Sequence, residues 1–163
     1  MKNYKYCPMC GTSLEWDHVD GRRRLACGEC GWIDYRNPLP VIACLVSNRK
    51  GELLLIKRGI APCKGAWALP GGFMEMDETP QEAGQRELRE ETGLEGMAGR
   101  LVGLHTQESP RYGSVLVSGI EFTVKNENIV TGDDAADAKF MPPKDFPDIP
   151  FASHRKLIEE FLK

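Results

Sequence analysis

Two Cys-x-x-Cys pairs near the N-terminus constrain the fold more than any other feature of the sequence. Cys7 and Cys10 form the first pair, Cys27 and Cys30 form the second, and sixteen residues separate the two pairs. This spacing is typical of four thiolates that bind one zinc ion, with redox-active pairs as the alternative. A unit of about 30 residues buries too little apolar surface to fold alone, so bound Zn²⁺ would supply folding free energy. We therefore predict a structural zinc site in a small separate unit over residues 1–36.

The overall composition fits one ordinary globular domain with a small appendage. The chain has 163 residues, 41% of them apolar and 28% charged, and a net charge of −3. This slight acidity argues against a general nucleic-acid binder, which needs a basic surface. The longest apolar run spans only residues 41–46, whereas a membrane-spanning helix needs about 20 apolar residues. Without an apolar leader segment, the chain is expected to be cytoplasmic and to have no membrane partner.

The hydrophobic pattern after residue 37 predicts alternating strands and helices. Residues 34–40 are expected to be a linker, because they hold two prolines and an asparagine. Two β-rich runs, 41–47 and 52–58, flank a turn and predict a hairpin. Residues 67–73 are predicted to form a strand followed by a Gly-Gly turn. Further strands are predicted at 100–106, 115–124 and 138–141, with a final amphipathic helix around 157–162.

A central helix is predicted over residues 80–92, and it carries unusually many charges. Thr79 and Glu82 match a capping box, and Gly93 matches a C-terminal stop. Between residues 75 and 95, eight carboxylates stand against two arginines, a local charge of −6. Helical spacing places three of these carboxylates on one face, where like charges repel; they are Glu87, Glu90 and Glu91. Such a face is either a solvated polar surface or a site for hard divalent cations, Mg²⁺ or Mn²⁺.

These residues resemble the Nudix family of hydrolases. Gly72, five residues, Glu78, seven residues and then RELREETGL over residues 86–94 fill every fixed position of the Nudix box. The segments WALPGG and LLLIKR are also similar to the family's surroundings of the box. The resemblance implies an α/β fold, the Nudix α/β/α sandwich with a mixed sheet, over residues 37–163. It is preceded by a small β-rich zinc ribbon over residues 1–36.

The resemblance also implies a reaction and the residues that perform it. Nudix enzymes hydrolyse a phosphoanhydride that joins a nucleoside diphosphate to another group, using water activated by divalent metal. Glu87, Glu90 and Glu91 correspond to the metal-binding glutamates, and Glu90 is the candidate base. Arg86 and Glu78 resemble the pair that orients these carboxylates. The Gly71 carbonyl corresponds to a further metal ligand, and a glycine at Gly72 lets the backbone approach the metal and the substrate closely.

The zinc ribbon narrows the range of substrates that the resemblance implies. NADH pyrophosphatases share the layout but carry an SQPWPFPxS-like stretch, where this chain has HTQESPRYGS. The CxxCG repeats, YRNP and IPFASHRKLIEEFL are more similar to ADP-ribose and FAD pyrophosphatases. We therefore expect hydrolysis of ADP-ribose to AMP plus ribose 5-phosphate, or of FAD to AMP plus FMN. The resemblance also implies a homodimer. NADH, a damaged nucleoside triphosphate, and a nucleic-acid-binding adaptor without catalysis remain the alternatives.

The residues that bind the substrate are predicted from their position in the sequence and their chemistry alone. Arg58 ends a strand and is either a phosphate ligand or a surface arginine. Arg111 and Tyr112 lie in a loop where they would hold a base or ribose, or only cap a turn. Asp137 resembles a late acidic position that some family members place near the site, with a surface carboxylate as the alternative.

Overall fold

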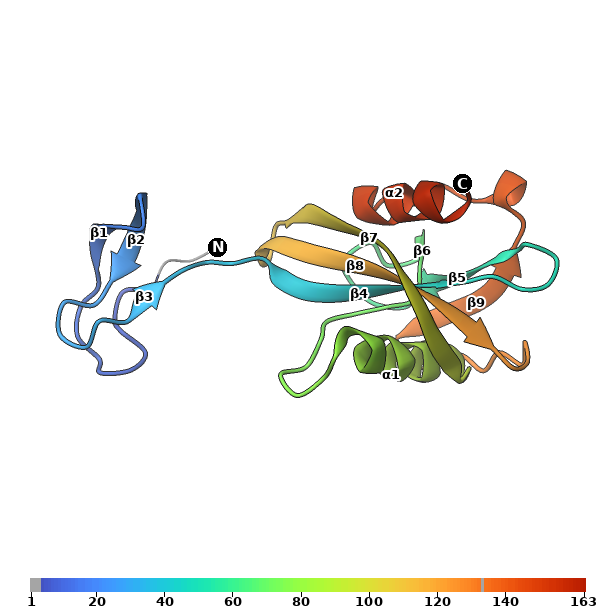
Figure 1. The fold of residues 1–163 in the computed structure, drawn as a ribbon, viewed down its shortest axis with the longest axis horizontal. Helices are drawn as coiled ribbons and strands as arrows, with labels where there is room; N and C mark the ends of the chain where they lie inside the picture. Colours follow the sequence, from blue (N-terminus) through green and yellow to red (C-terminus); the bar gives the residue numbers. More distant parts are fainter. Residues whose placement is uncertain (1–3, 133) are drawn as a thin grey trace.

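A small N-terminal unit and a larger unit make up the chain. The computed structural model describes residues 4–132 and 134–163. Figure 1 shows a small unit at one end of the molecule and, beyond a connecting segment, helices on opposite sides of a group of strands. Residues 35–38 form this connection and have no regular secondary structure. Within the described ranges, no helix is long and apolar enough to cross a membrane.

The N-terminal unit is an antiparallel sheet with a minimal core. Its strands are β1 (Glu15–Val19), β2 (Arg22–Ala26) and β3 (Ile33–Asp34), in the order β1-β2-β3. The apolar cluster of this unit consists of Cys7, Leu14, Leu25 and Cys27, with Trp32 packed against it. So few buried side chains offset little of the conformational entropy of ordering the unit, so its stability depends on a further source of folding free energy.

The larger unit contains a mixed sheet. Its strands are β4 (Leu39–Val46), β7 (Gly96–Ser109) and β8 (Gly113–Val124), in the order β4-β8-β7. β4 runs parallel to β8, and β7 runs antiparallel to β8. The mixed sheet and the flanking helices confirm the predicted fold class.

A second, antiparallel sheet lies beside the first. It consists of β5 (Leu53–Arg58), β6 (Trp67–Ala68) and β9 (Ala135–Met141), in the order β6-β5-β9. The predicted hairpin of residues 41–47 and 52–58 is therefore wrong, because β4 and β5 belong to different sheets; only an isolated bridge between Ser47 and Leu53 joins their ends. Both strands bury side chains on both faces, so each strand needs its own hydrogen-bonded neighbour and apolar side chains packed on both of its faces.

Two helices cover the sheets from opposite sides (Figure 1). α1 (Pro80–Thr92) begins at Thr79 with the predicted capping box and ends at Gly93 in the left-handed conformation, which confirms its predicted bounds. α2 (Ala152–Phe161) follows a short 3₁₀ turn, η1 (Pro143–Asp145). α1 packs on a cluster that includes Ile42 and Phe122, and α2 packs on a separate cluster.

Candidate active site

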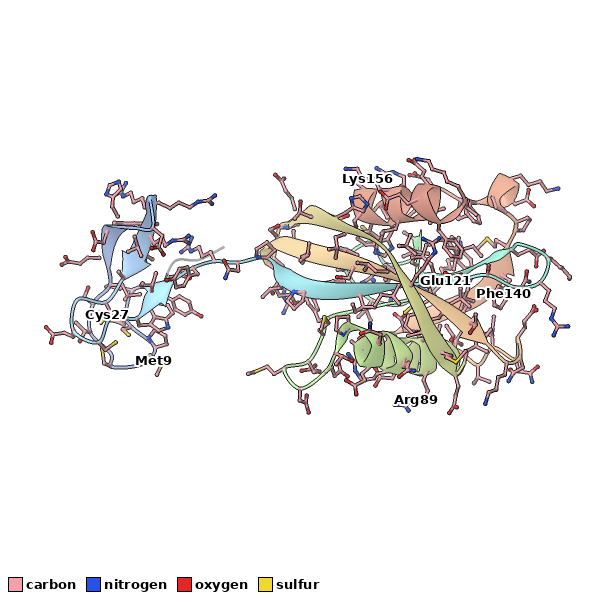
Figure 2. The ribbon with its side chains drawn as sticks, viewed as in Figure 1. Met9, Cys27, Arg89, Glu121, Phe140 and Lys156 are labelled. Carbon is pink, nitrogen blue, oxygen red and sulfur yellow. The ribbon has the colours of Figure 1, made fainter. Side chains whose placement is uncertain are left out.

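The four N-terminal cysteines converge on one point. Their sulfur atoms all lie within 4.8 Å of one another, and both the Cys7–Cys30 and Cys10–Cys27 sulfur pairs are 3.5 Å apart. The two turns are built alike, because the N–H groups of Gly11 and Gly31 donate to the carbonyls of Cys7 and Cys27. Four thiols in this arrangement match the donor set of a tetrahedral zinc site. Figure 2 shows Cys27 in this unit, apart from the helices.

The predicted acidic face of α1 lines a cavity in the larger unit. The cavity has a volume of about 500 Å³, and its lining residues are Glu87, Glu90, Glu91, Gly132 and Asp134. On another face of the helix, Arg89 projects away from the sheets (Figure 2). The helix therefore turns its carboxylates toward one side, as the spacing predicted.

Arg86 holds three of the box carboxylates in place. Its Nε and Nη2 contact Glu78 at 2.6 and 3.1 Å, so this pair is bidentate. Its Nη1 donates to Glu87 at 2.7 Å and to Glu90 at 3.0 Å. Its Nη2 also donates to the Phe73 carbonyl at 2.9 Å. The planar guanidinium thus fixes the carboxylates relative to the backbone that follows the Gly-Gly turn.

Glu91 is the most buried carboxylate of the site. Its exposed fraction is only 6%, and its Oε2 accepts the N–H of Gly71 at 2.8 Å. Desolvation raises the pKa of Glu91 to about 8, and the negative charge of Glu87 adds to this, although the Gly71 hydrogen bond opposes it. Desolvation also raises the pKa of Glu87. Buried carboxylates with raised pKa values bind a proton or a cation readily.

The Gly-Gly turn lies so close to β4 and α1 that a side chain at Gly71 would clash with the backbone, and one at Gly72 would displace the Glu87 carboxylate. Gly71 has a φ of +148°, and a Cβ there would lie 2.0 Å from the Ile42 carbonyl oxygen. A Cβ on Gly72 would lie 2.4 Å from an Oε1 atom of Glu87. Only glycine lets the backbone approach the carboxylates at this distance.

Gly132 and Asp134 belong to the cavity, but the sequence analysis missed them. A Cβ on Gly132 would lie 1.9 Å from the Glu90 carbonyl oxygen, so this loop requires glycine to reach α1. The Asp134 carbonyl accepts the N–H of Gly59 at 2.7 Å, which ties the loop to the end of β5. An acidic residue shortly after a glycine was the available signal. Asp137, the late acidic candidate, instead lies opposite Lys57 in the β5–β9 ladder.

The predicted substrate-reading residues lie outside the lining of this cavity. Arg58 donates from Nε to the Pro62 carbonyl at 2.8 Å, and its guanidinium lies over the Phe151 ring. Its positive charge opposes the rise in the Glu91 pKa. Arg111 lies over the Tyr112 ring at the turn between β7 and β8.

The donor set of the cavity fits hard divalent cations. Carboxylate oxygens are the ligands that Mg²⁺ and Mn²⁺ prefer, and four carboxylates here face one space. Within the described ranges, the four cysteines form the one group whose ligand atoms are already gathered as a metal site requires. The carboxylates of Glu87 and Glu91 are instead held by Arg86 and by the Gly71 N–H. Glu87, Glu90, Glu91 and Asp134 are therefore the residues that could hold a metal.

Family comparison agrees with this geometry. The NUDIX domain model matches residues 37–161, and a second model, described as Nudix N-terminal, matches residues 5–36. The first match covers well over half of the chain, so the chain belongs to the Nudix family and is a Nudix hydrolase.

Individual relatives show the same relationship. The ADP-ribose pyrophosphatase of Methanocaldococcus jannaschii is 35% identical over 131 residues, which are 79% of this chain and 76% of that enzyme. The NAD-capped RNA hydrolase NudC of Vibrio vulnificus is 32% identical over 91 residues, which are 56% of this chain but only 33% of the relative. A NUDIX hydrolase structure from Nitrosomonas europaea has a TM-score of 0.80 and 26% identity, and the match covers 96% of this chain and 89% of that chain.

Proposed function

We propose that this Nudix hydrolase is an ADP-ribose pyrophosphatase that requires Mg²⁺ or Mn²⁺ and releases AMP and ribose 5-phosphate. The observation that carries the proposal is the placement of Glu87, Glu90 and Glu91 around one cavity that Asp134, from the loop before β9, also lines. Four carboxylates would repel a diphosphate unless cations neutralised them. The cavity therefore suits a reaction in which an anionic anhydride is attacked in the presence of divalent metal.

Each box residue has a distinct role in this proposal. Glu87 and Glu91 would hold the divalent cations, with the Gly71 carbonyl as a further ligand. Cations held there would supply charge neutralisation of the diphosphate and acidification of the attacking water. Arg86 keeps Oε2 of Glu90 at 3.0 Å, which leaves the other oxygen of this half-exposed side chain to accept a proton from water. Glu78 orients Arg86, and in return the hydrogen bonds from Arg86 lower the pKa of the Glu78 carboxyl.

The choice of substrate is supported by similarity and by residues near the cavity. The Methanocaldococcus jannaschii relative named above is an ADP-ribose pyrophosphatase, and the match extends over most of both chains. Arg58 is assigned to a substrate phosphate, because its Nε is held by a backbone carbonyl and its positive charge favours the ionised form of Glu91. Arg111 and Tyr112 are assigned to the base or ribose, and Gly72 to close backbone contact. FAD is the second substrate to be tested, since the zinc-ribbon layout is shared by both groups.

A chromatographic assay tests this proposal. The purified protein is incubated with ADP-ribose, FAD, NADH or a nucleoside triphosphate, with Mg²⁺, with Mn²⁺, or with a chelator. The expected result is AMP and ribose 5-phosphate from ADP-ribose at the highest kcat/KM, with no product after chelation. Release of pyrophosphate from the triphosphate at a higher kcat/KM would instead identify a sanitising hydrolase.

The N-terminal unit is proposed to be a zinc ribbon over residues 1–36, followed by the Nudix domain over residues 37–163. Its four cysteines are proposed to bind one structural Zn²⁺, separate from the catalytic cations. The homodimer and the cytoplasmic location stay predictions, to be checked by sedimentation and by fractionation of cells.

A further inference from the structure

The glycine turn of the active site is held by hydrogen bonds from two elements already described. Residues 69–72 run along the free edge of β4, where the N–H groups of Ile42 and Cys44 donate to two of their carbonyls, at 2.8 Å each. On the other side, the Gly71 N–H donates to Glu91 of α1 at 2.8 Å. The position of the turn relative to Glu91 therefore depends on how firmly this segment is fixed.

A third tie comes from α2, on the opposite side of the sheets. β6 ends at Ala68, and the next residue, Leu69, is buried with an exposed fraction of 1%. Its N–H donates to Nδ1 of His154 at 3.2 Å. A buried N–H without a partner would be costly, so the imidazole satisfies a group that no strand reaches.

The His154 ring is fixed in the state that this bond needs. Because Nδ1 accepts a hydrogen, the ring is neutral and carries its proton on Nε2. Desolvation lowers the pKa of His154 to about 4, and the positive charge of Arg58 adds to this effect. The ring also packs against Phe151, with the ring centres 5.1 Å apart. The preceding residue of α2 is held as well, because the N–H and hydroxyl of Ser153 donate to the Gln107 side-chain oxygen.

We infer that His154 is a positioning residue of the active site, which acts through the backbone of Leu69 on Gly71 and so on Glu91. This inference rests on the cation site of the proposed function. His154 touches neither the carboxylates nor the substrate in this role. Losing its acceptor would leave the Leu69 N–H unsatisfied, and the segment would shift toward water, which would displace the Gly71 contact with Glu91.

The test compares two histidines that both connect α2 to the rest of the domain. His154→Leu removes the acceptor at similar volume. His154→Asn keeps an acceptor near the position of Nδ1, whereas His154→Gln keeps an amide but moves the acceptor outward. The matched control is His105→Leu, because His105 of β7 contacts Glu160 of α2 at 3.1 Å and does not contact the glycine turn. The readouts are Mn²⁺ affinity of the full chain without substrate, measured by electron paramagnetic resonance, together with kcat, KM and Tm.

The inference predicts a specific pattern of Mn²⁺ affinity and kinetics across these variants. His154→Leu and His154→Gln should weaken Mn²⁺ binding by between about threefold and about tenfold, the range that one buried hydrogen bond supplies. They should lower kcat more than they raise KM, and His154→Asn should restore both. His105→Leu should lower Tm while its Mn²⁺ affinity stays at the parent value.

Three results would overturn the inference: unchanged Mn²⁺ affinity in His154→Gln or in a folded His154→Leu, an equal loss in His105→Leu, or no recovery in His154→Asn. If His154→Leu does not fold, the contrast between the Asn and Gln variants decides the matter. If the parent protein does not cleave ADP-ribose, the proposed substrate is wrong, whereas the Mn²⁺ series still decides the role of His154.

Discussion

Replacing Glu91 with glutamine should stabilise the metal-free protein in a pH-dependent way. The carboxyl has its usual pKa of 4.5 in the unfolded chain and a pKa of about 8 in the folded one, because folding desolvates it. Between these two values the unfolded state releases the proton and the folded state retains it. The unfolded state is therefore favoured progressively as the pH rises, and the contribution of Glu91 to stability, complete below pH 4.5, is lost by pH 8.

The magnitude follows from the two pKa values. Each pKa unit corresponds to roughly 1.4 kcal/mol, so the gap in unfolding free energy between Glu91→Gln and the parent should widen by about 3 kcal/mol from pH 5 to pH 8. The glutamine oxygen can still accept the Gly71 N–H, so the contact at 2.8 Å need not be lost. The variant should nevertheless lose most of its catalytic rate, because an amide cannot replace the charge of a cation ligand.

Urea unfolding of metal-free parent and variant at several pH values measures this gap. Glu90→Gln is the matched control, since Glu90 lies on the same helix but its side chain is 55% exposed. The gap should widen more for Glu91→Gln than for Glu90→Gln, because folding buries Glu91 almost completely and leaves Glu90 half exposed. Added Mg²⁺ should stabilise the parent more at pH 8 than at pH 5, because the cation competes with the proton. A gap for Glu91→Gln that stays constant from pH 5 to pH 8 would refute the reasoning.

Substitutions at three further positions test other parts of the molecule. Arg86→Ala should lower activity by roughly 100-fold, because it releases three carboxylates from their positions, and Arg86→Lys should recover only part of this rate; steady-state kinetics with Mg²⁺ measure both. Gly132→Ala should weaken Mn²⁺ binding, since the new methyl group would clash with the Glu90 carbonyl and push the loop from α1; titration with Mn²⁺ would contradict this if the affinity were unchanged. Cys27→Ser should reduce bound zinc from about one ion per chain and unfold only the N-terminal unit. Metal analysis and calorimetry check this result, and retention of zinc by the variant would argue against the proposed ligand set.

The central helix was predictable because its signals are local. A capping box, a proline at the first position and a glycine stop lie within one segment, and they fix both ends of α1. The same holds for the cysteine turns, where each Cys-x-x-Cys pair and its glycine form one compact loop. Carboxylate spacing on a helix then places Glu87, Glu90 and Glu91 on one side without any tertiary information.

Long-range pairing was not predictable from the sequence. Adjacent β-rich runs suggested a hairpin, yet β4 pairs with β8, which begins at Gly113. Gly132 and Asp134 were missed for the same reason, because only the folded loop brings them to α1. Arg58 and Tyr112 lie outside the cavity lining, and their roles depend on a bound substrate. Their contacts with the substrate therefore stay predictions.

The parallel ladder between β4 and β8 also has a consequence for biosynthesis. It joins Leu39 to Val115 and Val46 to Phe122, so residues far apart along the chain must meet before the sheet exists. Until the ribosome has released β8, the apolar residues of β4 have no permanent cover, and the glycine turn has no fixed edge to lie on. A nascent chain that ends before Gly113 should therefore be vulnerable to chaperone binding and proteolysis, and catalytic competence should arise only late in synthesis.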